Sequence, residues 1–161
     1  MQIILSDARN QLRKMLPRLL EIFAEFSRTR PDTILHLHCD PAVPSSGTES
    51  NHLQSLINEM GIHKQTRFTK NFRYNKGLHV EDLAKLYQAA DLHLLVSGGE
   101  GFGLSMLQAA VTAVMPFAPN YSANSELIAD HGELIKVQTF MRDRFGIRRA
   151  IVDIDDASYS G

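Results

Sequence analysis

Short apolar runs alternate along the chain with longer segments in which apolar residues recur every three or four positions. The short runs predict strands over residues 2–6, 33–38, 66–70, 92–97, 115–118 and 134–137. The longer segments predict helices over residues 11–28, 50–60, 80–90, 103–113 and 124–129. Strands that alternate with helices build a parallel sheet covered on both faces, so we predict an α/β fold with a Rossmann-like, doubly wound sheet.

Length and composition set the outer limits of this prediction. At 161 residues the chain fits one domain over residues 1–161, and a formal net charge of −1 gives no reason to expect nucleic acid as a partner. No apolar run approaches the length that spans a bilayer, so we expect no direct membrane span. A single cysteine, Cys39, excludes an internal disulfide and suits a reducing compartment, which favours a cytoplasmic location. Residues 151–157 are expected to form a strand or turn with no helix after it.

A glycine-rich stretch at residues 97–108 carries the most chemistry. Its sequence is SGGEGFGLSMLQ, and it lies between a predicted strand and a predicted helix. Glycines allow the backbone to approach a ligand, and the first N–H groups of a helix lack partners and favour anions. The acid within the turn, Glu100, would repel a phosphate and is better suited to hydroxyl groups. Phosphate and hydroxyl groups together indicate a sugar nucleotide.

A basic cluster at the start of the first predicted helix forms the second candidate segment. Arg9, Arg13 and Lys14 place cations where the helix dipole disfavours them, and a bound anion would reverse that cost. A solvated basic surface is the alternative interpretation. Both segments follow strands, so they should meet at the carboxyl edge of the sheet, where doubly wound folds bind ligands.

These segments, with LYQAAD at residues 86–91 and YSANSEL at 121–127, resemble the family 4 (group 1) glycosyltransferases of GT-B fold. The EGFGL sequence that begins at Glu100 is similar to the donor-site motif of that family, in which a second Glu follows after seven residues. The resemblance covers nearly the whole chain. It implies the C-terminal, donor-binding half of a GT-B fold, with the N-terminal acceptor domain and the C-terminal helices apparently absent.

The resemblance also implies an activity. The expected enzyme is a retaining, metal-independent, hexosyltransferase-type glycosyltransferase that takes a sugar from a UDP- or GDP-type donor, with no other cofactor. The isolated domain is expected to be inactive because the acceptor side would belong to the missing domain, through which the parent protein could also associate with a membrane. The main alternative is a non-catalytic module that binds a nucleotide sugar.

Site residues follow from the same resemblance. Glu100 is expected to hold the transferred sugar, and Arg9 and Lys14 are expected to clamp the diphosphate. The expected binding residues are Arg13, Gly101, Phe102, Gly103, Leu104, Ser105 and Gln108. Gln108 departs from the family pattern, since its neutral amide stands where a Glu would accept hydrogen bonds from both ribose hydroxyls.

Other functions explain the sequence less well. The spacing of Gly99, Gly101 and Gly103 does not fit the dinucleotide fingerprint, and the clustered acids of a flavodoxin-like or response-regulator site are missing. His36 and His38 share one strand face, which suits packing and hydrogen bonding better than a metal site. Cys39 is best interpreted as structural. Glu126 fits equally a ligand contact and the first turn of a helix.

Overall fold

The computed structural model describes residues 1–41, 52–70, 72, 77–128 and 130–159. Its parallel sheet contains β1 (Gln2–Asp7), β2 (Thr33–His38), β3 (Thr66–Phe68), β4 (Leu92–Leu94), β5 (Met115–Pro119) and β6 (Glu133–Ile135). The helices between these strands are η1 (Leu12–Lys14), α1 (Leu16–Thr29), α2 (Leu53–Glu59), α3 (Val80–Gln88), α4 (Leu104–Val111) and α5 (Ala123–Leu127). The chain continues through β7 (Val137–Arg142), β8 (Arg148–Val152) and α6 (Ile154–Tyr159).

The strand order β3-β2-β1-β4-β5-β6 confirms the predicted doubly wound sheet. Neighbouring strands in this sheet are parallel, and Ile4 of β1 lies opposite Leu35 of β2 and Leu92 of β4. The order reverses direction between β1 and β4. Such a fold binds its ligand beyond the carboxyl ends of the two strands at this point, here after Asp7 and Leu94.

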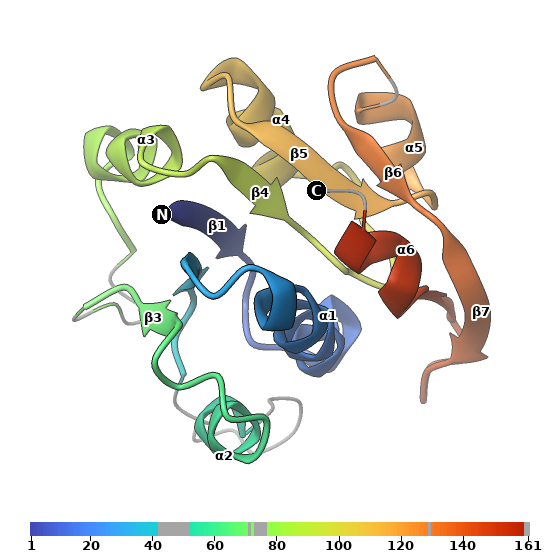
Figure 1. Ribbon diagram of the computed structural model, residues 1–161. Coiled ribbons are helices and arrows are strands. Elements are labelled where there is room, and N and C mark those ends of the chain that lie inside the picture. Colours follow the sequence, from blue (N-terminus) through green and yellow to red (C-terminus); the bar gives the residue numbers. More distant parts are fainter. Residues whose placement is uncertain (42–51, 71, 73–76, 129, 160–161) are drawn as a thin grey trace.

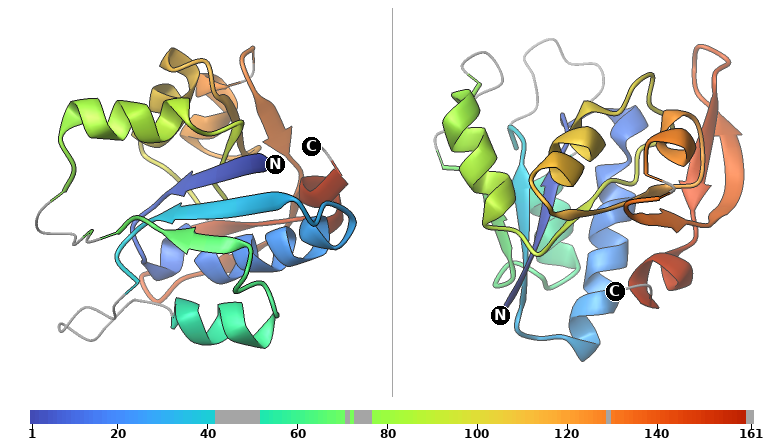
Figure 2. Two further views of the ribbon diagram at one scale, coloured as in Figure 1. Left: turned by 60° about the vertical axis from the view of Figure 1, so that its left-hand side comes forward. Right: turned by 90° about the horizontal axis from the view of Figure 1, so that it is seen from above.

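Helices cover both faces of the sheet, as Figures 1 and 2 show. The helices α1, α2 and α6 lie on one face, and α3, α4 and α5 lie on the other. Alternation along β4 divides its side chains between the two layers. Leu92 and Leu94 belong to the large core that includes the apolar face of α1. His93 points the other way and stacks on the ring of Tyr87 from α3, with 5.5 Å between the ring centres.

Burial of His93 makes stability depend on pH. Complete burial and the charge of Lys14 lower the pKa of His93 to about 3, while the unfolded chain binds a proton near the ordinary value of 6.5. Because only the unfolded state is protonated between these values, stability should fall as the pH falls from about 6.5 to about 3. We expect His93→Gln to flatten the dependence of the urea midpoint on pH, and His52→Gln, at an exposed site, to leave it unchanged. Equal slopes for wild type and His93→Gln would contradict this.

The first helix begins later than predicted. Residues 12–14 form a 3₁₀ turn, Met15 adopts a left-handed φ of 51°, and α1 starts at Leu16. Pro17 explains the break because its ring nitrogen has no hydrogen to donate to the carbonyl of Arg13, and its ring would clash with that carbonyl. The expected helix over residues 11–28 was therefore wrong over its first turn.

Other predicted boundaries differ by a few residues. The strand expected over 66–70 ends at Phe68, and the one expected over 92–97 ends at Leu94. The strand expected over 134–137 ends at Ile135, and the chain then enters β7. The helices expected over 50–60, 80–90, 103–113 and 124–129 appear as the shorter α2, α3, α4 and α5, and positions 50, 51 and 129 lie outside the described residues.

The segment after β6 departs from the prediction more clearly. The strands β7 and β8 form an antiparallel, two-stranded hairpin, and α6 follows it and packs against α1. The strand or turn expected over residues 151–157 is thus the end of β8 and the start of a helix. The Arg18 side chain of α1 secures the hairpin, since it donates to the carbonyl of Val152 at 2.8 Å and to Oε1 of Gln138 at 2.9 Å.

Candidate functional site

The break before α1 joins the two candidate segments. Without an N–H at Pro17 the carbonyl of Arg13 is available, and it accepts the N–H of Gly98 at 2.8 Å. The hydroxyl oxygen of Ser97 also lies 3.4 Å from this carbonyl oxygen. The basic turn and the glycine-rich turn are therefore held edge to edge at the carboxyl ends of β1 and β4.

Side chains from the same two turns form a charged cluster. The Lys14 ammonium nitrogen Nζ pairs with Oε1 of Glu100, and Arg13 Nη1 lies 3.5 Å from Oε2. The side chains of Lys14 and Glu100 are only 11% and 9% exposed, whereas that of Arg13 is 40% exposed. The structure thus brings together three residues that the sequence had singled out, and it leaves the Arg13 guanidinium accessible.

Electrostatics keep Glu100 ionised. Burial acts to raise the pKa of its carboxyl, but hydrogen bonds from Lys14 and Ser97 and the positive charges of Lys14 and Arg13 hold the pKa below its usual value. The backbone N–H of Glu100 donates to Oγ of Ser122 at 2.9 Å, which fixes the turn against the segment after β5. The cluster of Arg13, Lys14 and Glu100 carries one positive charge in excess, and Glu100 precedes the first residue of α4 by four positions.

The N-terminus of α4 adds partial positive charge to this surface. Gly103 is the N-cap residue, with a left-handed φ of 86°, and among the described residues no side chain caps the helix. The first helical N–H groups, at Leu104 and Ser105, precede those that bond back to the carbonyl of Gly103. The predicted helix start at Gly103 is therefore one residue early, but the predicted backbone donors stand at the helix end.

Gly103 gives a direct test of this turn. A Cβ at this position would lie 3.0 Å from Cδ1 of Leu127, and the left-handed φ costs an L-residue about 1–2 kcal/mol. We expect Gly103→Ala to reduce the free energy of unfolding by more than this amount, because the close contact with Leu127 adds to the cost of φ, and urea titration measures the loss. Gly61→Ala is the matched control, since Gly61 has a φ of 72° but open space around its Cα. The same loss at both sites would assign the effect to φ alone.

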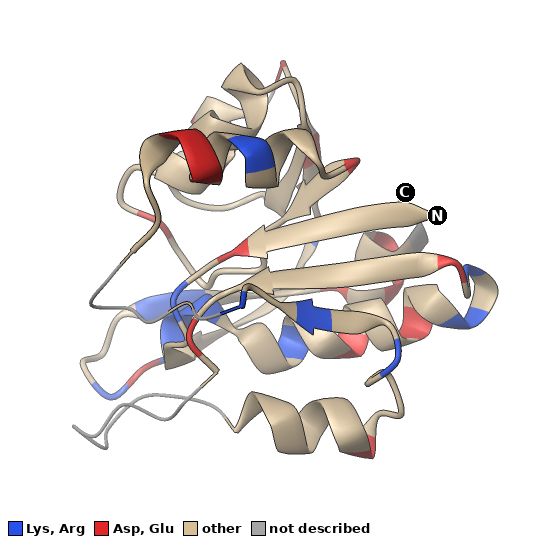
Figure 3. Cartoon of the chain, turned by 90° about the vertical axis from the view of Figure 1, so that its left-hand side faces the viewer, with Lys and Arg blue, Asp and Glu red and all other residues tan. Residues whose placement is uncertain are grey.

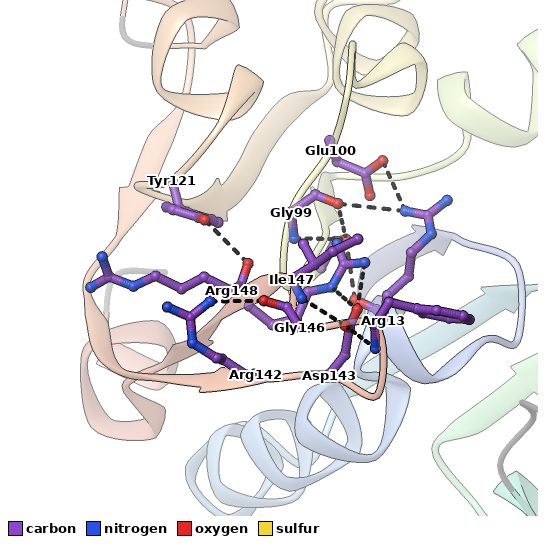
Figure 4. Close-up of polar contacts among 12 residues, drawn as sticks. Arg13, Gly99, Glu100, Tyr121, Arg142, Asp143, Gly146, Ile147 and Arg148 are labelled. Atoms are coloured by element: carbon purple, nitrogen blue, oxygen red, sulfur yellow. Dashed lines mark hydrogen bonds and ion pairs between the residues drawn. The ribbon is translucent and has the colours of Figure 1, made fainter.

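The β7–β8 hairpin supports the glycine turn from the other side. The N–H of Ala150 donates to the carbonyl of Gly98 at 3.1 Å, and a Cβ on Gly98 would lie 3.0 Å from Cβ of Arg149. The Tyr121 hydroxyl donates to the carbonyl of Arg148 at 3.2 Å (Figure 4). Figure 3 shows basic segments gathered at the end of the sheet to which the strands point. The hairpin therefore packs directly against the glycine turn.

The remaining predicted residues occupy different positions around this cluster. Arg9 is exposed in the loop between β1 and η1, and Gly101 and Phe102 are exposed at the tip of the glycine turn. Leu104 is exposed, and Ser105 and Gln108 are half-buried on α4. Oε1 of Gln108 lies 3.3 Å from the hydroxyl of Tyr87. Roles for these residues remain predictions.

The other candidates have structural surroundings. His36 Nε2 and His38 Nδ1 both contact Oγ1 of Thr69 at 2.9 Å, as expected for hydrogen-bonded strand histidines. Burial and the nearby charges of Asp40 and Asp7 raise the pKa of the Cys39 thiol to about 12, which disfavours the reactive thiolate. Within the described ranges no group of three or more His, Cys, Asp or Glu could hold a metal ion. Glu126 is exposed in the first turn of α5.

Sequence reasoning missed several residues of the site. Ser97 and Ser122 hold the glycine turn through their hydroxyls, and Asp7 accepts from the buried Tyr87 hydroxyl at 3.0 Å. The position of Asp7 directly after a predicted strand was an available signal, as was Tyr87 in the family-like segment 86–91. Arg149 had no such signal, because the hairpin itself was not predicted.

Comparison with known families now identifies the class of this chain. The chain matches the model of the family described as glycosyl transferases group 1 over residues 2–141, and it belongs to that family. The fold and the family together define a glycosyltransferase domain of the GT-B, Rossmann-like kind. A comparison with curated protein sequences finds no match.

Solved structures agree on the fold. The C-terminal domain of a glycosyl transferase group 1 family protein (LpcC) from Francisella tularensis is 22% identical with a TM-score of 0.69, and the match covers 86% of this chain and 69% of that one. WaaG, a glycosyltransferase involved in lipopolysaccharide biosynthesis, is 18% identical with a TM-score of 0.70, over 98% of this chain and 36% of that one. A mutant of TarM from S. aureus, solved with UDP among its ligands, is 18% identical with a TM-score of 0.71, over 98% of this chain and 27% of that one.

Two of these similar proteins are much longer than this chain. The chain spans about a third of the WaaG chain and about a quarter of the TarM chain, so it corresponds to one part of those larger proteins. In the described part of the chain, no helix is both long enough and apolar enough to cross a membrane.

Proposed function

We propose that this chain is the donor-binding domain of a retaining glycosyltransferase that uses a nucleotide-diphosphate sugar of the UDP or GDP type. The observation that carries the proposal is the cluster of Arg13, Lys14 and Glu100 beside the N-terminus of α4. The cations and the helix end suit a diphosphate, and the ionised acid suits sugar hydroxyls. The structure of TarM with UDP, which has the same fold, supports this choice of ligand.

In this proposal the domain assists the departure of the diphosphate. Negative charge grows on the leaving phosphate as the sugar bond breaks, and fixed donors placed around it lower the barrier without a metal. Arg13 and Lys14 supply full charges, with Arg9 as a further cation from the adjoining loop, and Leu104 and Ser105 supply backbone N–H groups. Glu100 holds the sugar so that its anomeric carbon faces the acceptor. The acceptor would be bound by a second domain, a proposal that the greater length of WaaG and TarM supports.

Calorimetric titration of this chain with UDP, GDP and ADP tests the proposal. Saturable binding of one diphosphate would support a donor-binding domain and would name its nucleotide. Absence of binding at millimolar concentrations of all three would contradict it.

One observation favours a second function, a non-catalytic module that binds a nucleotide sugar. Gln108 is neutral where the family motif has an acid, and hydrogen bonds to a neutral acceptor are about half as strong as those to a charged one. The two functions can be distinguished by combining the chain with an acceptor domain and measuring the transfer of radiolabelled sugar. Only the glycosyltransferase function predicts that transfer.

A further inference from the structure

The hydroxyl of Tyr87 occupies a buried junction behind the candidate site. Tyr87 is 1% exposed, and its hydroxyl lies 3.0 Å from Oδ2 of Asp7 at the end of β1. The same hydroxyl lies 3.3 Å from Oε1 of Gln108 and 3.3 Å from the carbonyl oxygen of Ser105, both in α4. Three oxygen atoms therefore surround a group that has one hydrogen to donate.

The charge of Asp7 decides where that hydrogen goes. Burial and the neighbouring Asp7 raise the pKa of Tyr87 above its ordinary value, so the phenol keeps its hydrogen. Asp7 offers the shortest contact, and hydrogen bonds to a carboxylate are about twice as strong as those between neutral groups. Burial raises the pKa of the Asp7 carboxyl above its ordinary value, and the charges of His38 and Lys14 and the hydrogen bond from Tyr87 oppose that rise. At pH 8 the carboxyl is ionised and accepts the phenolic hydrogen.

Gln108 must then serve the phenolic oxygen as a donor. The side-chain amide exchanges its oxygen and nitrogen by a half-turn, so either atom can occupy the position 3.3 Å from Tyr87. With the phenolic hydrogen already given to Asp7, the favourable arrangement places Nε2 of Gln108 against the phenolic oxygen. That arrangement turns Oε1 of Gln108 away from Tyr87 and leaves it as an acceptor on a half-buried residue.

We propose that Asp7 and Tyr87 are positioning residues that orient the amide of Gln108, so that its carbonyl oxygen accepts a hydrogen bond from a ribose hydroxyl of the donor nucleotide. This inference rests on the proposed function and deepens it. A neutral residue is favourable at position 108, because Asp7, which also contacts the Tyr87 hydroxyl, already carries a negative charge. The Tyr87 hydroxyl can donate its one hydrogen to only one carboxylate. A Glu at position 108 would place a second carboxylate beside it, without a hydrogen bond to accept.

The proposal and a decayed site, in which Gln108 is a damaging replacement of the family's Glu, predict opposite effects of Gln108→Glu on the affinity for the diphosphate. Gln108→Glu should weaken binding of the diphosphate about 10-fold, because its charge is repelled by Asp7 and it has no hydrogen for the phenolic oxygen. The double variant Asp7→Asn with Gln108→Glu should recover most of the loss, because a single carboxylate again faces Tyr87. In a decayed site Gln108→Glu would instead tighten binding.

The experiment is calorimetry at pH 8 with the diphosphate that the wild type binds, UDP or GDP, and with its 2′-deoxy form. We expect the wild type to prefer the ribose form about 5- to 10-fold, and Tyr87→Phe and Gln108→Ala to lose that preference while they still bind the diphosphate. Gln88→Glu, at an exposed position of α3, is the matched charge control and should behave as the wild type. Thermal unfolding of each variant shows which are folded.

The outcomes separate the two proposals. A wild type that binds no diphosphate overturns the proposed function and this inference with it. A wild type that binds, with a folded Tyr87→Phe that keeps the full ribose preference, overturns the positioning roles alone. Tighter binding by Gln108→Glu, or no recovery in a folded double variant, also overturns them. Where Tyr87→Phe does not fold, the comparison of Gln108→Glu with the double variant decides.

Discussion

Replacing Lys14 by methionine is expected to weaken binding of UDP or GDP about 10- to 100-fold. A hydrogen bond to a charged group is worth about 1.5–3 kcal/mol, and a 10-fold change in affinity corresponds to about 1.4 kcal/mol. The same change leaves the poorly exposed Glu100 without its nearest cation, so we also expect the free energy of unfolding to fall by about 1–3 kcal/mol. Calorimetry and urea titration measure the two effects separately.

The control for this variant is Lys64→Met, which removes one positive charge at an exposed position and should leave both quantities unchanged. If Lys14→Met loses stability but binds the diphosphate as the wild type does, Lys14 only neutralises Glu100 and takes no part in phosphate binding.

Replacing Glu100 by glutamine is expected to act in opposite directions on two ligands. The free nucleotide diphosphate should bind as tightly as before or several-fold more tightly, because Lys14 is released from its ion pair and a repulsive charge is removed. The nucleotide sugar should lose about 10-fold or more, because a charged acceptor for the sugar hydroxyls becomes a neutral amide. The ratio of the two dissociation constants, measured by competition calorimetry, isolates the sugar contact from general damage.

Glu59→Gln, at the exposed end of α2, is the matched control and should leave the ratio at its wild-type value. Parallel losses for both ligands in Glu100→Gln would show that Glu100 organises the turn without contacting the sugar.

The sequence predicts the central sheet well for a physical reason. Parallel strands are buried on both faces, so runs such as residues 33–38 and 92–97 stand out as apolar against their flanks. The meeting of Arg13, Lys14 and Glu100 was also predictable, because their turns follow β1 and β4, which are adjacent at the reversal of strand order. The match to the group 1 family confirms the resemblance that the sequence motifs indicated.

The details that were missed depend on long-range contacts or on single residues. The late start of α1 follows from Pro17, whose effect an apolar pattern over residues 11–28 conceals. The first strand of the hairpin, β7, is mostly exposed, so it lacks the apolar alternation from which strands are predicted. The ion pair of Lys14 with Glu100 needs two side chains 86 positions apart to point at each other, which no local pattern encodes.

The hairpin described above links the glycine turn to the first helix. One of its strands bonds to Gly98, and the same strand ends at the carbonyl of Val152, which the Arg18 side chain of α1 holds. Local opening of the hairpin would therefore break its contacts with Gly98 and with Arg18 together. The amide hydrogens of the glycine turn and of the hairpin strand should then exchange as one cooperative unit. A ligand bound at the glycine turn would then slow exchange at Ala150, on an element that it need not touch.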